Sequence, residues 1–162
     1  LQSIVIPDKV TLIENSAFSN CSALSEIIIS DSVTDIGYSA FQNTAYYMNT
    51  ENWENGTLYV GNHLVAAKEV TESFTVKQGT VSIAQQVFYN RKNLTSVTLP
   101  DSIKGLSWNS FGNCTALTKI IFGGSTETWK SITKKSYWNS GTGNYTIECT
   151  NGKLNKSENI IT

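Results

Sequence analysis

A 23-residue period in the apolar positions is the feature that most constrains how this chain folds. Residues 1–21 follow the pattern Leu-x-x-Ile-x-Ile-x-x-x-Val-x-x-Ile-x-x-x-Ala-Phe-x-x-Cys, and residues 24–44 repeat it 23 positions later. Diverged copies return over residues 71–91 and 94–114. A fixed period of about 20 to 30 residues is typical of solenoids, in which each coil buries its apolar side against its neighbours. We therefore predict a repeat protein.

Each copy predicts the same local structures. The opening Leu-x-x-Ile-x-Ile alternates and is rich in β-branched residues, which favours a strand. Turn-forming pairs such as Pro7-Asp8 and Pro100-Asp101 close it. The following Val-x-x-Ile predicts a second, shorter extended piece. The Ser-Ala-Phe-x-Asn-Cys segment is too short for an independent helix, so it predicts one helical or 3₁₀ turn on the outer side.

Stacked coils place equivalent residues above one another. The repeat phenylalanines should form a spine of buried rings, and they are Phe18, Phe41, Phe88 and Phe111. An asparagine two residues later is present in all four copies, at Asn20, Asn43, Asn90 and Asn113. These asparagines either form a ligand-binding ladder or close the turn in left-handed backbone geometry, and the second interpretation is favoured.

The period breaks between the second and third copies, where about one extra coil's length is inserted. Two apolar runs, residues 57–60 and 63–66, flank Gly61-Asn62, which predicts a β-hairpin. We expect this hairpin to replace a coil and to keep the stack continuous. Tyr46, Tyr47 and Trp53 precede it. They are interpreted either as filling the irregular joint, which is favoured, or as a binding patch.

The C-terminal residues are predicted to form a cap over the last coil. After Gly123-Gly124 a helix is expected, with Trp129 and Ile132 on one face, and residues 145–149 predict a closing strand. Residues 152–162 are expected to be a short strand or a loose tail. The predicted organisation is one domain with two repeats in 1–46, a hairpin insert in 47–70, two repeats plus a final strand in 71–122, and a cap and tail in 123–162. We expect this domain to be a fragment of a longer protein.

The cysteines are expected to be free. Cys21 and Cys114 occupy the same repeat position in different coils. With strands about 4.8 Å apart and at least three steps between these coils, they lie roughly 14 Å or more from each other, and a disulfide needs Cα atoms within about 7 Å. We predict that both are buried as small apolar side chains. Cys149 has no assigned partner.

Composition and motifs exclude several function classes. Charged residues make up only 15%, the net charge is −1, and Ser, Thr and Asn supply a third of the chain, so a nucleic-acid partner is not expected. No apolar run is long enough for membrane insertion. His63 is the only histidine and is expected to be a surface or packing residue. No motif indicates catalysis, a cofactor or a metal site, so we predict that the protein is not an enzyme.

The repeat resembles that of the BspA-like (Treponema pallidum type) leucine-rich repeat family. The resemblance rests on the repeat pattern itself, on the Leu58-Tyr59-Val60-Gly61-Asn62 segment of the insert, and on the residues 124–132 and 147–152 of the closing segment. Thr44 and Arg91 depart from the pattern at the cysteine position, and Lys77 departs from it at the proline. The resemblance implies an α/β leucine-rich-repeat solenoid: a right-handed, strand-rich superhelix whose strands line the concave side.

The same resemblance implies a secreted or cell-surface bacterial protein, because members with assigned roles are adhesins. We expect a monomeric, protein-binding module whose partner is a host matrix or microbial surface protein. The alternatives are a structural spacer and a glycan-binding module that uses the aromatics of the insert. The expected concave-face site consists of strand residues that lie between the inward apolar positions, namely Ser3, Val5, Glu26, Ile28, Ser73, Thr75, Ser96, Thr98, Lys119 and Ile121.

Overall fold

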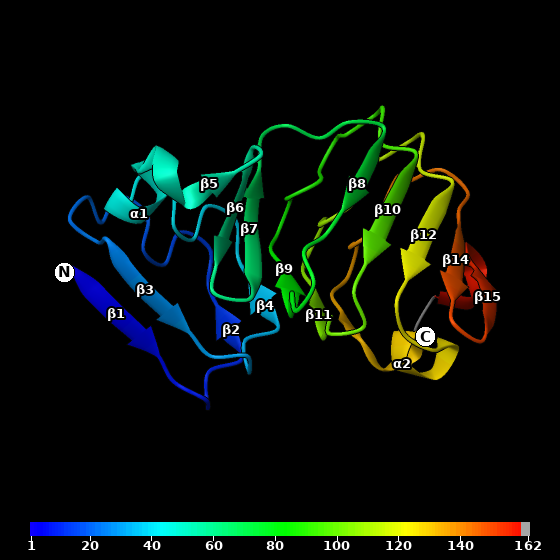
Figure 1. Cartoon of the computed structure of the whole chain (residues 1–162), viewed down its shortest axis with the longest axis horizontal. Coiled ribbons are helices and arrows are strands. Elements are labelled where there is room, and N and C mark those ends of the chain that lie inside the picture. The colour runs from blue at the N-terminus through cyan, green and yellow to red at the C-terminus, as the bar shows by residue number, and fades with distance from the viewer. Residues whose placement is uncertain (160–162) are drawn as a thin grey trace.

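The computed structural model describes residues 1–159 and shows a strand-rich solenoid whose two ends lie far apart (Figure 1). The first strand of each coil belongs to what we call the inner sheets. Apolar and exposed positions alternate along these strands, as expected for a sheet with one buried face. The inner strands are β1 (Ser3–Ile6), β3 (Glu26–Ile29), β8 (Ser73–Thr75), β10 (Ser96–Leu99), β12 (Lys119–Phe122) and β14 (Thr146–Cys149).

The second extended piece of each coil is also formed, as predicted, and we call these short segments the side strands. All of them except the last contain a buried residue of the repeat, such as Ile13, Ile36 and Ile83. The side strands are β2 (Leu12–Ile13), β4 (Asp35–Ile36), β9 (Ser82–Ile83), β11 (Gly105–Leu106) and β13 (Thr133–Lys134).

The outer segment of each coil is a run of β-turns, so the prediction of a helical turn was wrong. In the first coil the N–H groups of Ala17 and Ser19 donate to the carbonyls of Glu14 and Ser16 at 3.2 and 3.0 Å. Ser16 and Asn20 have φ angles of 56° and 63°, and left-handed residues cannot continue a helix. The four repeat asparagines all have φ between 57° and 63°, which confirms the turn-closing interpretation.

The phenylalanine spine is formed in two separate parts. Phe18 stacks on Phe41 with ring centroids 5.6 Å apart, and Phe88 stacks on Phe111 at 4.9 Å. The second pair continues into Trp138, whose ring lies edge-on to Phe111 at 6.0 Å. The predicted continuous spine was therefore wrong at one step, because the insert separates the second coil from the third.

The insert forms the predicted hairpin but does not keep the stack continuous. Its elements are α1 (Ala45–Met48), the 3₁₀ helix η1 (Thr50–Asn52), β5 (Trp53–Glu54), β6 (Thr57–Val60) and β7 (His63–Ala67). Strand β7 pairs in parallel with the side strand β9, whereas no insert strand pairs with an inner strand. The inner strands consequently divide into a two-stranded sheet, β1-β3, and a five-stranded sheet that begins at β8.

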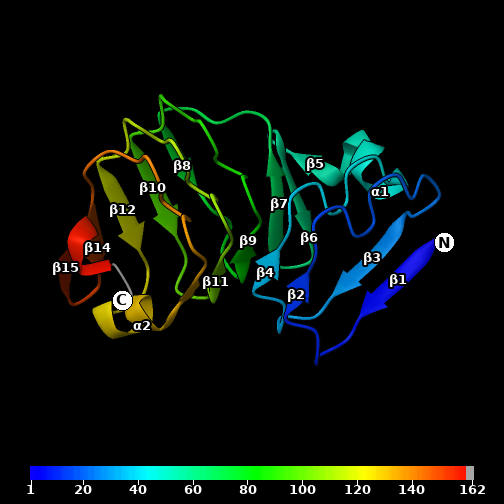
Figure 2. The same ribbon diagram turned by 180° about the vertical axis from the view of Figure 1, so that it is seen from behind.

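The two halves of the solenoid meet at an angle, with β6 and β7 between them in both views (Figures 1 and 2). Strand β4 of the first half lies against the outer surface of β9 and β11. The Gln85 N–H donates to the Ile36 carbonyl at 2.8 Å, and the Ile36 N–H donates to Ser107 Oγ at 3.1 Å. An ion pair between Lys135 and Asp35, at 3.2 Å, continues this contact. We call this region the joint.

The C-terminal elements cover the last coil, as predicted. Helix α2 (Thr126–Ser131) begins after Ser125, whose hydroxyl accepts from the Thr128 N–H, and Trp129 is fully buried. Strand β14 is the predicted closing strand, and β15 (Gly152–Asn155) pairs with it antiparallel before the 3₁₀ helix η2 (Lys156–Asn159). The expected short strand or tail covered residues 152–162, of which residues 160–162 lie outside the described residues. Cys21, Cys114 and Cys149 are all free, which confirms that Cys21 and Cys114 form no bridge.

Candidate functional site

The residues predicted to form one concave face lie on two separate sheets. In the first, Ser3 is in register with Glu26, and Val5 with Ile28. In the second, Ser96 pairs with Ser73 and Lys119, and Thr98 pairs with Thr75 and Ile121. The structure thus brings together each half of the predicted set but not the two halves, because β3 and β8 are not neighbours. We call the exposed side of the five-stranded sheet the C-terminal inner face.

The C-terminal inner face changes character along its length. Hydroxyl side chains occupy its start on β8 and β10, and the charged residues Lys119, Glu148 and Lys153 occupy its end on β12, β14 and β15. Glu148 lies 3.0 Å from Lys153 and 3.6 Å from Lys119. Hydrogen bonding from Lys153 lowers the pKa of the Glu148 carboxyl. Ile121, which is in register with Glu148, is 39% exposed, so the face combines hydroxyl, apolar and charged side chains.

A second candidate site exists where the coils separate at the joint. Elsewhere, the outer turns of adjacent coils are linked by a ladder of backbone hydrogen bonds. The N–H groups of Phe18 and Asn20 donate to the second coil at 2.8 and 2.9 Å, and those of Phe88 and Asn90 donate to the fourth coil at 2.8 Å. This ladder recurs because every coil repeats the same backbone geometry.

Between the second and third coils the ladder is open. The equivalent donors are the N–H groups of Ser39, Phe41 and Asn43, and the equivalent acceptors are the carbonyls of Gln85, Val87 and Tyr89. Within residues 1–159, none of these six groups has a hydrogen-bond partner. The hairpin supplies a side strand at this level but no outer turn, which explains the opening.

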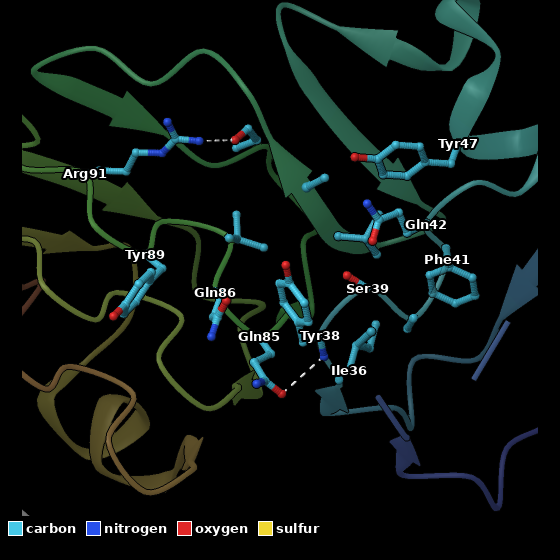
Figure 3. A pocket seen from close by; sticks show the side chains of 16 residues that line it. Ile36, Tyr38, Ser39, Phe41, Gln42, Tyr47, Gln85, Gln86, Tyr89 and Arg91 are labelled. Carbon is cyan, nitrogen blue, oxygen red and sulfur yellow. Dashed lines mark hydrogen bonds between the residues drawn. The ribbon is translucent and has the colours of Figure 1, made fainter. Parts of the chain in front are cut away.

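The opening is a cleft with a volume of about 260 Å³ (Figure 3). Its floor is Val65, Ala66 and Ala67 of β7, one wall is the outer turn 37–42, and the opposite wall is the turn 85–91. Tyr47 of α1 closes one side. Figure 3 shows aromatic and amide side chains distributed around it, among them Tyr38, Gln42, Tyr47, Gln86 and Tyr89.

Among the described residues, Arg91 is the only charged one that lines this cleft. Its Nη2 donates to the Ala67 carbonyl at 2.5 Å, which ties the third coil to the floor. Its Nε is buried without a hydrogen-bond partner among the described residues, and none of the ion pairs in that part of the chain includes it. Partial burial raises the pKa of Tyr47, so its hydroxyl stays protonated at neutral pH.

The aromatics of the insert mainly pack against other residues of the insert. The Tyr46 hydroxyl donates to the Tyr59 carbonyl at 2.8 Å, and Trp53 Nε1 donates to the Tyr47 carbonyl at 2.7 Å. Lys68 Nζ lies 3.8 Å from the centroid of the Trp53 ring. These contacts favour the joint-filling interpretation, and Tyr47 alone of the three expected aromatics lines the cleft.

His63 is fully buried and bridges the two halves. Its Nε2 lies 3.2 Å from the Ser30 carbonyl and its Nδ1 lies 2.8 Å from Ser82 Oγ. Because a carbonyl only accepts, Nε2 carries the proton and Nδ1 accepts from the Ser82 hydroxyl. Burial lowers the pKa of His63. Of the two roles expected from the sequence, a surface residue or a packing residue, His63 has the second.

Within residues 1–159, no group of three or more His, Cys, Asp or Glu side chains is placed to hold a metal ion. In the same range no helix is both long enough and apolar enough to cross a membrane.

The contact of β4 with β9 and β11, which forms the joint, was not foreseen from the sequence, although two signals mark it. Ser82, Gly105 and Ser107 are small where the first coil has Leu12 and Glu14, and small outward residues on a strand permit close approach of another backbone. Arg91, at the repeat cysteine position, was seen as a departure but not connected to the cleft.

The family model described as BspA type leucine rich repeat region matches six copies across residues 1–66 and 59–158. No curated protein matches the chain.

Solved structures give weaker likenesses. A leucine-rich cell surface protein of Faecalibacterium prausnitzii A2-165 is 19% identical over 98% of this chain, with a TM-score of 0.37. A leucine-rich repeat protein of Bacteroides ovatus is 19% identical over 91% of this chain, with a TM-score of 0.34. A leucine-rich repeat protein of T. pallidum is 16% identical over 88% of this chain, with a TM-score of 0.27. The chain spans 61%, 45% and 69% of these three chains.

Proposed function

Because the chain belongs to the family of BspA-type leucine-rich repeat proteins, we propose that it is a non-catalytic, protein-binding module of a bacterial surface protein. The proposed site is the C-terminal inner face, and the proposed partner is a host matrix protein or a protein on another microbe. The observation that carries the proposal is that this face presents an in-register array of side chains across five neighbouring strands.

The chemistry of this face suits a protein partner. A surface of hydroxyls with an exposed isoleucine and a charged end offers hydrogen bonds, apolar contact and ionic selectivity over a wide area. Small molecules instead need a concave pocket. None of Ser73, Thr75, Ser96, Thr98, Lys119 and Ile121 lines the cleft at the joint.

The non-catalytic part of the proposal rests on the site chemistry. Leucine-rich repeats are scaffolds, and function on a scaffold must be argued from its sites. The one histidine is buried with both ring nitrogens engaged by Ser30 and Ser82. The surface location draws on the Faecalibacterium prausnitzii protein, which is described as a cell surface protein.

A structural spacer is the second candidate, and the joint favours it. Hydrogen bonds through His63, Ser107 and Gln85, together with the Lys135–Asp35 ion pair, hold the two halves at one angle. A rigid bent rod of this kind would set the position of a neighbouring domain without binding a partner itself.

A matched pair of isoleucines separates these candidates. Ile121 and Ile28 occupy the same repeat position, but Ile121 lies on the C-terminal inner face and Ile28 on the two-stranded sheet. Binding of the chain to immobilised fibronectin, fibrinogen and mucin would be measured for the Ile121→Arg and Ile28→Arg variants. Saturable binding that only Ile121→Arg abolishes supports the proposal. Absence of binding by the folded chain, or equal loss in both variants, contradicts it.

A further inference from the structure

We propose that the cleft at the joint is a binding site for a short saccharide. This inference is independent of the protein-binding proposal, because it uses neither the C-terminal inner face nor its residues. It rests on the open backbone ladder, the side chains that line the cleft, its charge and its rigid floor.

The open ladder gives the two walls opposite polarity. The N–H groups of Ser39 and Phe41 are donors on one wall, and the carbonyls of Gln85, Val87 and Tyr89 are acceptors on the other. An extended peptide presents N–H and C=O groups alternately along each edge, so half of them would meet a like group on either wall. A hydroxyl both donates and accepts, so a polyhydroxyl ligand can satisfy both walls at once.

The lining side chains suit the C–H surfaces and the outer hydroxyl groups of a sugar ring. Tyr38 is 51% exposed, and its ring offers an apolar face to the C–H surface of a sugar ring. Tyrosine supplies such area with little loss of conformational freedom. The amides of Gln42 and Gln86 each carry donors and an acceptor for hydroxyl groups at the ring edge.

The charge of the cleft adds a preference. Its lining contains no acidic residue, and Arg91 contributes one positive charge. A guanidinium pairs well with a carboxylate. We therefore expect sugars that carry a carboxylate, such as uronic acids, to bind more tightly than neutral sugars of the same size.

The site is formed before any ligand arrives. Strand β7, which supplies the floor, pairs with β6 on one side and with β9 on the other. Arg91 and Gln85 hold the opposite wall to Ala67 and to the second coil. A preformed site loses less entropy on binding. The volume of about 260 Å³ lies just below the usual range for ligand pockets, so the cleft suits a short saccharide rather than a larger ligand.

The test begins with a defined glycan array that holds neutral and uronic-acid oligosaccharides, probed with the intact chain. The strongest array sugar is then titrated into ¹⁵N-labelled protein. We expect the amide resonances of Ser39 and Phe41, which line the cleft, to shift with one binding constant. The Tyr38→Ala, Gln42→Ala double variant should weaken binding by at least about tenfold, the loss typical of a hot-spot truncation.

Tyr137→Ala is the matched control, because Tyr137 is 66% exposed and does not line the cleft. It should bind as the unaltered chain does. Arg91→Gln should reduce the affinity for uronic acids by a larger factor than the affinity for neutral sugars, so that the preference between them falls. The proposal is overturned if no array sugar binds, if the double variant binds unchanged, or if an extended peptide shifts the amides of Ser39 and Phe41 and sugars do not.

Discussion

The carbonyl oxygen of Thr34 lies where a side chain at position 105 would begin. Gly105 belongs to β11 of the fourth coil, and Thr34 precedes β4 of the second coil, so two coils that are not neighbours in the repeat order touch through their backbones. Only the absence of a Cβ allows this approach. The contact marks the centre of the joint, which sets the angle between the halves.

Replacing Gly105 by alanine should therefore disturb the joint. A new Cβ would collide with the Thr34 carbonyl, and overpacking of this kind typically costs about 1 to 3 kcal/mol. We expect a lower free energy of unfolding and a changed small-angle scattering profile. Gly79→Ala is the control, because nothing lies near that position although its φ of 84° is unfavourable for alanine. If the scattering profile of Gly105→Ala matched that of the unaltered chain, the proposed role of this contact would be wrong.

Phe41→Ala should destabilise the first half strongly. Phe41 is 2% exposed, and truncation of a buried phenylalanine costs about 3 to 5 kcal/mol. Phe18→Ala should cost less, because Phe18 is half-buried although it stacks on Phe41. Urea unfolding of both variants measures the difference. A loss below about 1 kcal/mol for Phe41→Ala would show that this ring pair does not hold the coils together.

The free energy of unfolding should decrease as the pH falls, because His63 is buried in its neutral form. Burial lowers its pKa in the folded protein below the ordinary value of 6.5, so the unfolded chain binds the proton more readily. The stability is fully present above pH 6.5 and decreases as pH falls towards the folded-state pKa, by at most about 1.4 kcal/mol per pH unit.

Urea unfolding at pH 7.5 and 5.5 measures this dependence. The chain contains one histidine, so His63→Gln should remove most of the change between the two pH values. An equal change in the variant would assign the pH dependence to carboxylates instead.

The N-cap of α2 should stabilise the C-terminal cap. Ser125 Oγ accepts from the Thr128 N–H at 3.1 Å, and replacing such a residue with alanine costs about 1 kcal/mol. Ser125→Asp keeps an acceptor there and should retain the stability. Thermal unfolding of the two variants distinguishes them, and equal melting temperatures would mean that this hydrogen bond contributes nothing.

Most of each coil was predictable because its causes are local. Ile4 and Ile6 alternate on one face of a strand, Asn20 closes a turn, and Ser125 begins a helix, all by rules that act within a few residues. The outer helical turn was mispredicted because apolar spacing does not reveal that Ser16 is left-handed. The division of the predicted concave face was not foreseeable from Ser73 or Glu26, since each obeys the repeat.

What the sequence alone determined is the solenoid, because a period of 23 residues forces equivalent side chains inward in every coil that follows it. Only the tertiary structure decided how the two halves meet and where a ligand can enter. The insert follows no period, so whether its strands join the inner or the side sheet depends on competing packing across the whole joint. Strand β7 pairs with β9 and leaves Phe41 and Val87 facing across a gap. The cleft therefore exists because long-range contacts, which no local pattern encodes, favoured the angled arrangement.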